Sequence, residues 1–341
     1  MNYTLNYTLN YTFNFLLISL MSVVCKAQVL NVGEQTISYI DYSRERSLKT
    51  QVWYPTTDKD MKDSELPFLL SPTVKNATFV NKKYPLIVIS HGTGGNRMSL
   101  AWLAIELAKN GYIVIAPDHW GNTLDNKIPE YFVRYWERPL DMSFLLSSFL
   151  QDKRFNNYLD SERIATIGFS LGGYTALALA GIQLDCEMLK LNASSEQGRQ
   201  EFTVPEFGDL RKLVNNISCK EVPAALRDSR FKVHIALAPA LGLGISEQKQ
   251  NITAPILIIG ANDDQIAPIE TNALRYRKAI SGSEFIKLAG KTGHYIFLNE
   301  GNPQLRQEES TYYQDDNTVD RQLIHRQISA EIRDYLSNHL K

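Results

Sequence analysis

The sequence lacks several features that would assign it to a particular class of protein. Basic residues number 36 against 37 acidic ones, which gives a formal net charge of -1, and no basic run interrupts this balance. We therefore expect no nucleic acid partner. Neither H-E-x-x-H nor C-x-x-C occurs in the chain, so the sequence predicts no metal centre.

No hydrophobic run is long enough to cross a bilayer. The apolar stretch at residues 13–24 has about a dozen residues, whereas a transmembrane helix needs about 20. It fits the hydrophobic region of a signal peptide with a small residue, Ala27, at the cleavage point. We expect residues 1–27 to be removed and the mature protein to be secreted or periplasmic, without stable insertion in a membrane. A basic segment before the run is missing, and Cys25 lies in a poor context for a lipoprotein anchor.

The apolar pattern predicts an α/β fold with a doubly wound, mostly parallel sheet. Near-continuous apolar runs indicate strands buried on both faces, and segments of helical period alternate with them. Two earlier segments, residues 36–40 and 48–54, are typical of an opening antiparallel pair. The apolar runs are residues 85–90, 112–116, 164–168, 233–238 and 255–260, and the helical segments are 100–109, 140–150, 174–184, 270–280 and 323–340.

One interval, residues 183–230, breaks this alternation because it is too long for a simple connection. Its own amphipathic spacing indicates a lid over the carboxyl edge of the sheet, with a solvent-facing decoration as the alternative. Nothing else interrupts residues 28–341, so we expect one domain. The interval contains Cys186 and Cys219, the cysteines that would remain after export. A disulfide between them and two buried free thiols are both compatible with the sequence.

A short pattern at residues 168–173 carries the clearest chemical signal. Its sequence, G-F-S-L-G-G, follows a predicted buried strand and precedes a predicted helix. In this context G-x-S-x-G forms a sharp turn that holds the serine at the sheet edge, at the positive end of the following helix. The glycines leave room for neighbouring chain. The sequence therefore predicts Ser170 as a nucleophile.

A serine hydroxyl becomes nucleophilic when a histidine takes its proton and a carboxylate orients that histidine. His294 lies in a glycine-bounded loop after the last predicted strand, which suits a base that follows the nucleophile and the acid in the chain. His325 and His339 belong to the C-terminal helix, where packing or solvation is the better interpretation. The loop after the last long apolar run contains Asp263 and Asp264 side by side. Either could supply the carboxylate.

The charge that develops on a substrate carbonyl oxygen needs hydrogen-bond donors. The backbone N–H of Leu171 is one, and the glycine-rich turn H-G-T-G-G-N offers a second at Thr93. This turn has neither the ending of a P-loop nor the glycine spacing of a dinucleotide site, so we expect no cofactor. His91, His119 and Trp120 stand at strand ends and are candidates to line the pocket. A structural role is the alternative for the two histidines.

Taken together, these motifs resemble the predicted dienelactone-hydrolase and platelet-activating-factor-acetylhydrolase-like serine esterases of the α/β-hydrolase superfamily. The resemblance covers residues from about 48 to about 298. It implies the α/β-hydrolase fold, with Ser170, Asp264 and His294 as nucleophile, acid and base. It also implies Leu171 and Thr93 as the oxyanion donors. Besides the turn around Ser170, its motifs are V-W-Y-P at 52–55, S-H-G at 90–92, R-P-L-D at 138–141, D-S-R at 228–230, A-L-A-P-A at 236–240 and G-H-Y-I-F-L at 293–298.

The nucleophile decides between members of this group. Dienelactone hydrolases proper are similar but use a cysteine, so Ser170 favours ordinary carboxylic esters. We expect hydrolysis of small-molecule, short-acyl esters through an acyl-enzyme. Secreted cutinase-like and polyester hydrolases have a similar acid loop, D-x-I-A-P, which matches residues 264–268 and keeps polymeric esters as an alternative. A peptidase that uses the same three residues and a binding protein on an inactive scaffold are also compatible with the sequence.

Overall fold

The computed structural model describes residues 30–246 and 248–341. The expected signal peptide, residues 1–27, lies outside these residues. Over the described ranges, none of the helices is both long and apolar enough to cross a membrane.

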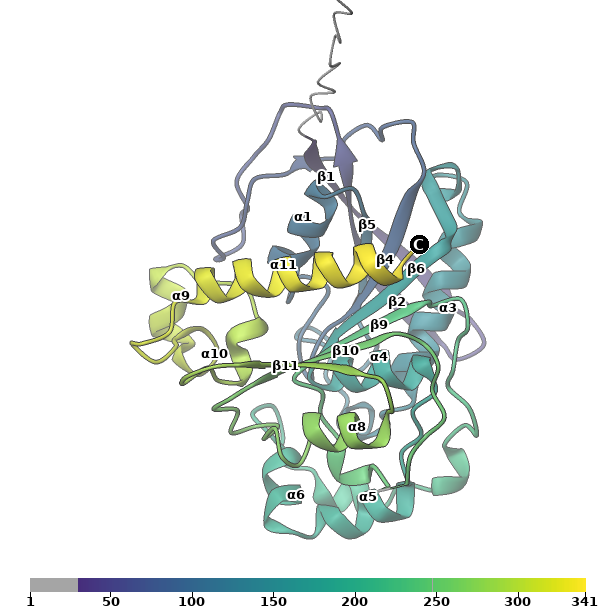
Figure 1. Ribbon diagram of the computed structural model, residues 1–341, viewed down its shortest axis with the longest axis vertical. Coiled ribbons are helices and arrows are strands. Elements are labelled where there is room, and N and C mark those ends of the chain that lie inside the picture. The colour runs from purple at the N-terminus through teal and green to yellow at the C-terminus, as the bar shows by residue number, and fades with distance from the viewer. Residues whose placement is uncertain (1–29, 247) are drawn as a thin grey trace, which may run out of the picture.

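Within the described residues, a sheet of nine strands forms the centre of the molecule (Figure 1). Its strands are β1 (Asn31–Asp41), β2 (Arg46–Thr56), β3 (Val74–Lys75), β4 (Tyr84–Ser90), β5 (Ile113–Pro117), β6 (Leu159–Phe169), β9 (Val233–Leu237), β10 (Ile256–Ala261) and β11 (Glu284–Leu288). Across the sheet they run β11-β10-β9-β6-β4-β5-β2-β1-β3. All neighbours from β11 to β5 are parallel, whereas β1 and β2 form the expected antiparallel pair. The predicted doubly wound, mostly parallel α/β sheet is confirmed.

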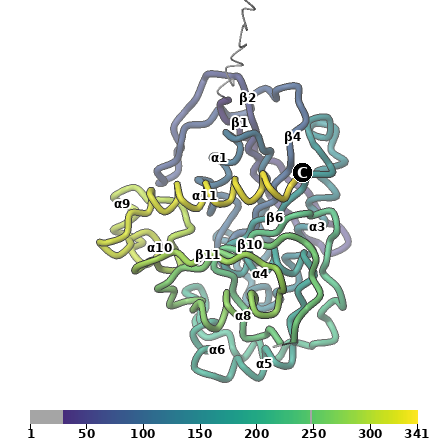
Figure 2. Tube along the Cα trace, viewed as in Figure 1, coloured from purple at the N-terminus to yellow at the C-terminus, as the bar shows by residue number. Residues whose placement is uncertain are grey.

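Two groups of helices cover the two faces of this sheet. On one face, α11 (Arg321–His339) crosses the strands beside α1 (Ala101–Lys109), as Figures 1 and 2 show. The other face is covered by α3 (Glu137–Gln151), α4 (Leu171–Ala180) and α8 (Ala273–Ala279). The apolar stripe of α11 docks on the sheet, whereas α4 is buried on every side. This full burial explains why the helix after Ser170 has no polar face.

Short elements complete the connections outside the insertion. These elements are α2 (Pro129–Val133), η1 (Asn156–Tyr158), η3 (Gly242–Gly244), η4 (His294–Phe297), α9 (Pro303–Glu308) and α10 (Ser310–Tyr313). All of them except η1, which leads into the amino end of β6, follow the carboxyl ends of parallel strands, where side chains from different strands can meet.

The interval between α4 and β9 folds into several short elements of its own. They are α5 (Cys186–Ala193), α6 (Glu196–Glu201), β7 (Thr203–Val204), β8 (Gly208–Asp209), α7 (Arg211–Asn215) and η2 (Cys219–Glu221). A disulfide joins Cys186 to Cys219, whose Cα atoms are 5.7 Å apart, so the alternative of two free thiols is wrong. Buried apolar side chains of this interval, among them Phe202 and Leu210, share one core cluster with Leu171 of α4. The interval therefore packs beside the turn that carries Ser170.

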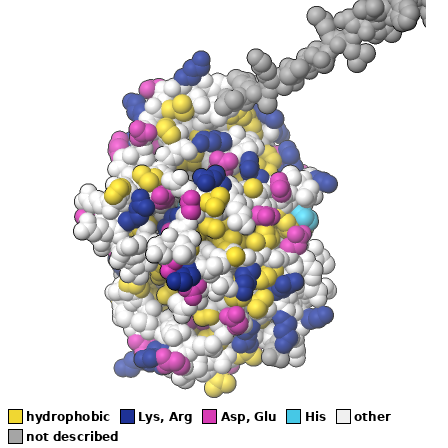
Figure 3. Space-filling model, turned by 60° about the vertical axis from the view of Figure 1, so that its left-hand side comes forward, with side chains coloured by type: hydrophobic (Ala, Val, Ile, Leu, Met, Phe, Trp, Pro, Cys, Tyr) yellow, Lys and Arg dark blue, Asp and Glu magenta, His cyan; other side chains and the backbone are white. Residues whose placement is uncertain are grey.

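The surface carries charges of both signs. Figure 3 shows one face of the molecule, on which basic and acidic side chains are interspersed among neutral ones. This distribution agrees with the near balance of 36 basic and 37 acidic residues in the sequence. On the face that Figure 3 shows, no broad patch of a single sign forms.

Candidate active site

Ser170 occupies a strained turn between β6 and α4. Its φ is 55° and its ψ is -117°. Residues other than glycine rarely adopt this backbone conformation. Glycine on both sides makes the turn fit: a Cβ added at Gly168 would lie 1.8 Å from the carbonyl oxygen of Gly172. A Cβ added at Gly172 would lie 2.1 Å from the carbonyl oxygen of Ser90. The turn therefore holds the Ser170 hydroxyl at the carboxyl edge of the sheet.

Three side chains from three loops form a continuous hydrogen-bonded chain. Ser170 Oγ lies 3.0 Å from Nε2 of His294, and His294 Nδ1 lies 2.7 Å from Oδ2 of Asp264. With Nδ1–H donating to the carboxylate, Nε2 is left to accept the proton of Ser170. The three residues are 8%, 5% and 4% exposed, respectively. The arrangement suits proton transfer away from the serine hydroxyl.

The structure separates the two neighbouring aspartates. Asp264 Oδ1 accepts hydrogen bonds from the N–H groups of Ile266 at 2.9 Å and Ala267 at 2.7 Å. These bonds fix the carboxylate with its other oxygen against His294. Asp263 is exposed, and its side chain bonds within its own loop. Of the two candidates, Asp264 is the one that contacts the histidine.

Two backbone N–H groups near Ser170 are available to a ligand. Leu171 is the first residue of α4, so its N–H has no acceptor in a preceding helical turn. Thr93 follows β4 and lines the same cavity as Ser170. In the part of the chain that the structure describes, neither N–H donates a backbone hydrogen bond. These are the two groups that the sequence predicts as oxyanion donors.

A cavity of about 320 Å³ opens over Ser170 and His294. The insertion supplies much of its wall, and apolar side chains dominate that wall. Two carboxylates, Glu201 and Glu206, also line it, and among the described residues around it there is no lysine or arginine. Its apolar and aromatic lining consists of Phe132, Phe169, Leu171, Phe202, Val204, Pro205, Leu210, Ala240, Leu241, Ile266, Ala267, Tyr295 and Tyr312.

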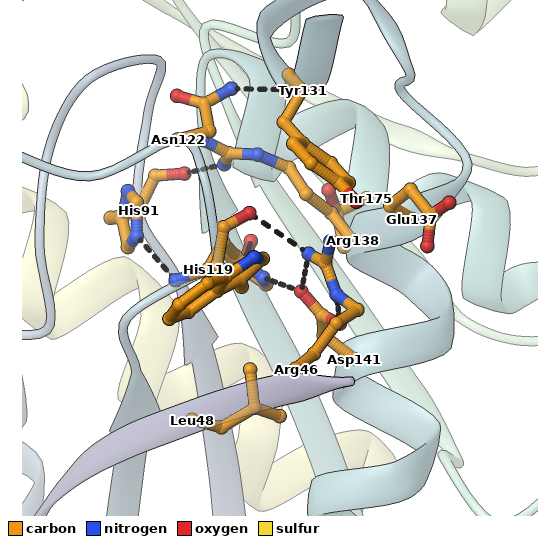
Figure 4. A network of polar contacts seen from close by, with 12 residues as sticks. Arg46, Leu48, His91, His119, Asn122, Tyr131, Glu137, Arg138, Asp141 and Thr175 are labelled. Atoms are coloured by element: carbon orange, nitrogen blue, oxygen red, sulfur yellow. Dashed lines mark hydrogen bonds and ion pairs between the residues drawn. The ribbon is translucent and has the colours of Figure 1, made fainter. Parts of the chain in front are cut away.

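A buried arginine holds the turn that carries Thr93 (Figure 4). Arg138 of α3 donates from Nη1 to the carbonyl of His91 at 2.5 Å and from Nη2 to the carbonyl of Gly92 at 3.0 Å. The carbonyl and the N–H of one trans peptide point in opposite directions. Because Arg138 fixes the Gly92 carbonyl, the N–H of Thr93 in the same peptide points away from Arg138.

The histidines expected at the pocket belong to this network instead. His91 donates from Nδ1 to Gly92 at 2.7 Å and accepts from the N–H of His119 at 3.2 Å. The His119 ring lies 2.9 Å from the Ser90 hydroxyl and 3.0 Å from Asp141. Both rings are thus hydrogen-bonded within the network, and neither of them lines the cavity. The expectation that His91, His119 and Trp120 line the pocket is therefore wrong for all three, and Trp120 is half-buried beside the network.

Asp141 forms ion pairs with two arginines of the network, Arg46 and Arg44, and its Oδ1 lies 3.0 Å from Nη2 of Arg44. Arg46 donates to both carboxylate oxygens of Asp141, at 2.7 Å each. Burial would raise the pKa of Asp141, but the hydrogen bonds from His119 and Arg46 hold that pKa at about 2. Burial lowers the pKa of His119 to about 4, so its ring is neutral at neutral pH. Burial likewise lowers the pKa of Arg138 to about 9, which leaves the guanidinium charged.

Sequence reasoning gave no role to Arg46, Arg138 or Asp141. Arg138 and Asp141 were considered only as part of the R-P-L-D motif at 138–141. In the structure Arg138 and Asp141 are three residues apart on a buried face of α3, which begins before the helix expected at 140–150. Charged side chains on a buried face must be paired or hydrogen-bonded, so the burial of this face accounts for the polar network.

Comparisons with known proteins give matches to several ester hydrolases. The family model described as platelet-activating factor acetylhydrolase, isoform II, matches residues 66–126. Cutinase est1 from Thermobifida alba is 28% identical over 203 residues, which cover 60% of this chain and 50% of the cutinase. Cutinase est2 from the same organism is 36% identical over 105 residues, which cover 31% of this chain and 33% of that protein. The chain thus spans at most about half the length of these two relatives.

Two further similarities concern other kinds of protein. Dipeptidyl-peptidase 5 from Porphyromonas gingivalis is 32% identical over 112 residues, which cover 30% of this chain and 15% of the peptidase. A solved structure of a ferulic acid esterase from Streptomyces cinnamoneus has a TM-score of 0.60 and 19% identity, over 93% of this chain and 92% of the esterase. At this identity the likeness concerns the fold. The sheet, the serine turn and this structural likeness together show that the chain has the α/β-hydrolase fold.

Proposed function

We propose that this chain is a carboxylic ester hydrolase that uses Ser170 as nucleophile, His294 as base and Asp264 as the acid that orients it. The observation that carries the proposal is the hydrogen-bonded chain from Ser170 Oγ to Asp264, at a strained turn that opens into a cavity. The similarity to two cutinases supports the same chemistry. An inactive binding scaffold would have no reason to keep this geometry intact.

The reaction follows from the positions of these groups. Ser170 Oγ attacks the substrate carbonyl carbon while its proton passes to His294 Nε2. The N–H groups of Leu171 and Thr93 hold the resulting oxyanion, and each such donor contributes roughly 3 kcal/mol to lowering the barrier. The alcohol leaves with the proton from His294, and water then releases the acid from the acyl-enzyme by the same steps. No cofactor takes part.

Small esters with short acyl chains are the substrates that the cavity fits best. Its volume is about 320 Å³, and the insertion residues Phe202 and Leu210 form part of its wall. Each methylene of the acyl chain gains about 0.8 kcal/mol on burial, but only until the cavity is full. A polyester needs an open groove, so the insertion argues against rapid polymer hydrolysis even though the cutinase matches favour it.

The domain organisation and the location of the protein are part of the same proposal. Residues 28–341 form one domain, with the insertion at about 183–230 as a lid over the site. The Cys186–Cys219 disulfide supports export, because such bonds persist in oxidising compartments. The protein is accordingly secreted or periplasmic.

Labelling with a fluorophosphonate probe tests this function. We expect covalent labelling of the wild-type protein and none of Ser170→Ala. Ser147→Ala, on α3 and outside the cavity lining, serves as a control that keeps the labelling. Paired p-nitrophenyl ester and p-nitroanilide substrates then separate an esterase from a peptidase, an alternative that the similarity to dipeptidyl-peptidase 5 raises. Equal labelling of wild type and Ser170→Ala would refute the proposal.

A further inference from the structure

The cavity contains a carboxylate that has no partner in the described part of the chain. Glu206 lies on the insertion between β7 and β8 and is half-buried. Over residues 30–246 and 248–341 no hydrogen bond or ion pair involves its side chain. The other carboxylate of the lining, Glu201, has a partner, because it accepts a hydrogen bond from the N–H of Leu241. Glu206 therefore presents an uncompensated negative charge to the cavity.

This carboxylate lies close to the reacting groups. A Cβ added at Gly94 would be 2.1 Å from Glu206 Oε1, so the carboxylate sits directly against the turn that carries Thr93. Two tyrosines, Tyr295 and Tyr312, line the same cavity as Glu206. Burial first, and the charge of Glu206 in addition, raises the pKa of both tyrosines. Glu206 and the two rings thus surround one part of the cavity.

The two rings form a single aromatic corner beside the proposed base. Tyr295 and Tyr312 pack edge to face with their centroids 4.8 Å apart, and both line the cavity. The ring of Tyr295 lies 5.2 Å from that of His294. The corner made by Glu206, Tyr295 and Tyr312 is therefore on the side of the cavity where His294 stands.

The chemistry of this corner selects for positive charge. An apolar group there would remove water from the carboxylate without replacing its hydrogen bonds, and an anion would be repelled. An ammonium group gains attraction from the carboxylate and from neighbouring aromatic rings. The leaving alcohol must take its proton from His294 Nε2, so the alcohol part of an ester lies on the His294 side. The apolar wall formed by Leu171, Phe202 and Leu210 is left for the acyl chain.

We propose that the cavity prefers esters whose alcohol part carries a positively charged ammonium group, which Glu206, Tyr295 and Tyr312 bind. This inference rests on the ester hydrolase function proposed above. It adds the class of substrate that this function serves, and it assigns Glu206 a role in specificity.

Two substrates of the same shape test the preference. Acetylthiocholine carries a trimethylammonium group where S-(3,3-dimethylbutyl) thioacetate carries a neutral tert-butyl group, and both release a thiol that can be measured in the same way. We expect kcat/KM to favour the cationic substrate by about fivefold to tenfold at low salt, mainly through KM. The preference should shrink as ionic strength rises, because salt screens the carboxylate.

Matched variants assign the preference to the corner. Glu206→Gln should bring the ratio of the two kcat/KM values close to one. Glu309→Gln removes the same charge from an exposed position whose charge also acts on Tyr312 but which does not line the cavity. This control should keep the wild-type ratio. A wild-type ratio of one or less would overturn the inference, as would an unchanged ratio in Glu206→Gln.

A third substrate separates failure of the inference from failure of the function. Turnover of p-nitrophenyl acetate without turnover of either thioester would overturn the ammonium preference and leave the hydrolase intact. No turnover of any ester, with no fluorophosphonate labelling, would overturn the proposed function itself.

Discussion

Arg138 Nη2 donates a hydrogen bond of 3.0 Å to the carbonyl oxygen of Gly92, across 46 residues of sequence. That carbonyl belongs to the same peptide as the N–H of Thr93, the proposed second oxyanion donor. Arg138 thus acts on the oxyanion site from behind, without a place in the cavity lining. It is a positioning residue for the proposed reaction.

Replacement of this arginine should lower kcat more than it changes KM. Arg138→Lys keeps a charge but loses the planar fork that holds two carbonyls at once. Because an oxyanion donor acts in the transition state, we expect kcat for p-nitrophenyl acetate to fall by roughly 10- to 100-fold with KM within about threefold. The control variant is Arg230→Lys. It makes the same change at an arginine that donates a hydrogen bond to the Ser143 carbonyl of α3. Equal losses in the two variants, at equal melting temperatures, would contradict the positioning role.

The two neighbouring aspartates should differ sharply in their effect on activity. Asp264→Asn removes the charge that orients His294, so we expect kcat to fall by roughly three orders of magnitude or more. Asp263→Asn changes an exposed side chain of the same loop and should leave kcat within about threefold. Steady-state kinetics of both purified variants decides the matter. If Asp263→Asn were the crippling change, the acid would be assigned to the wrong residue.

The acyl preference should reflect the volume left beside the insertion. We expect kcat/KM for p-nitrophenyl esters to peak between acetate and hexanoate and to fall for longer chains. Phe202→Ala enlarges the cavity at its apolar wall and should move the maximum of kcat/KM toward longer acyl groups. A wild-type preference for dodecanoate, or rapid hydrolysis of a polyester film, would show that the insertion does not limit the acyl chain.

Acid should destabilise the fold partly through His234. Burial lowers its pKa from 6.5 to about 4 in the folded protein. Between these values the unfolded chain binds a proton that the folded chain does not. The free energy of unfolding therefore falls as pH decreases through this window, by up to about 1.4 kcal/mol per pH unit for this residue.

Urea unfolding of a variant at several pH values between 4.5 and 7 measures this contribution. His234→Gln keeps a donor for the carbonyl of Ala176, which His234 Nδ1 reaches at 2.9 Å, but cannot take up a proton. We expect a shallower dependence of stability on pH than in the wild type. His339→Gln, which removes an exposed histidine, should keep the wild-type slope. Identical slopes for all three proteins would rule out His234 as a contributor.

Local signals explain what the sequence predicts well. The turn around Ser170 depends on glycines at fixed spacing, and the buried strands depend on apolar runs, so both are visible in short windows. Element ends are less visible. β6 begins at Leu159 rather than at 164, because its polar first half pairs with Tyr84 and Pro85 through a register shift that no apolar pattern marks. Helix α4 begins at Leu171 rather than at 174, because the turn after β6 ends at Ser170 and the helix follows directly.

Long-range pairings explain what the sequence does not predict. Arg46 of β2 meets Asp141 of α3 across 95 residues, and a buried ion pair of this kind leaves no periodic trace in either segment. The network draws His91 and His119 away from the cavity, where strand ends alone would place them. The position of Glu206 depends on how the insertion packs over Gly94, which its composition does not specify.

The φ of 55° at Ser170 bears on the stability of the protein as well as on its chemistry. Glycine adopts this backbone region freely, whereas serine held there costs about 1 to 3 kcal/mol. A glycine at this position would relieve the strain, and the chain could form the same turn. Ser170→Gly should therefore remove the hydroxyl and relieve the backbone strain at the same time. Ser170 thus holds its hydroxyl at the cavity at the expense of the stability of the fold.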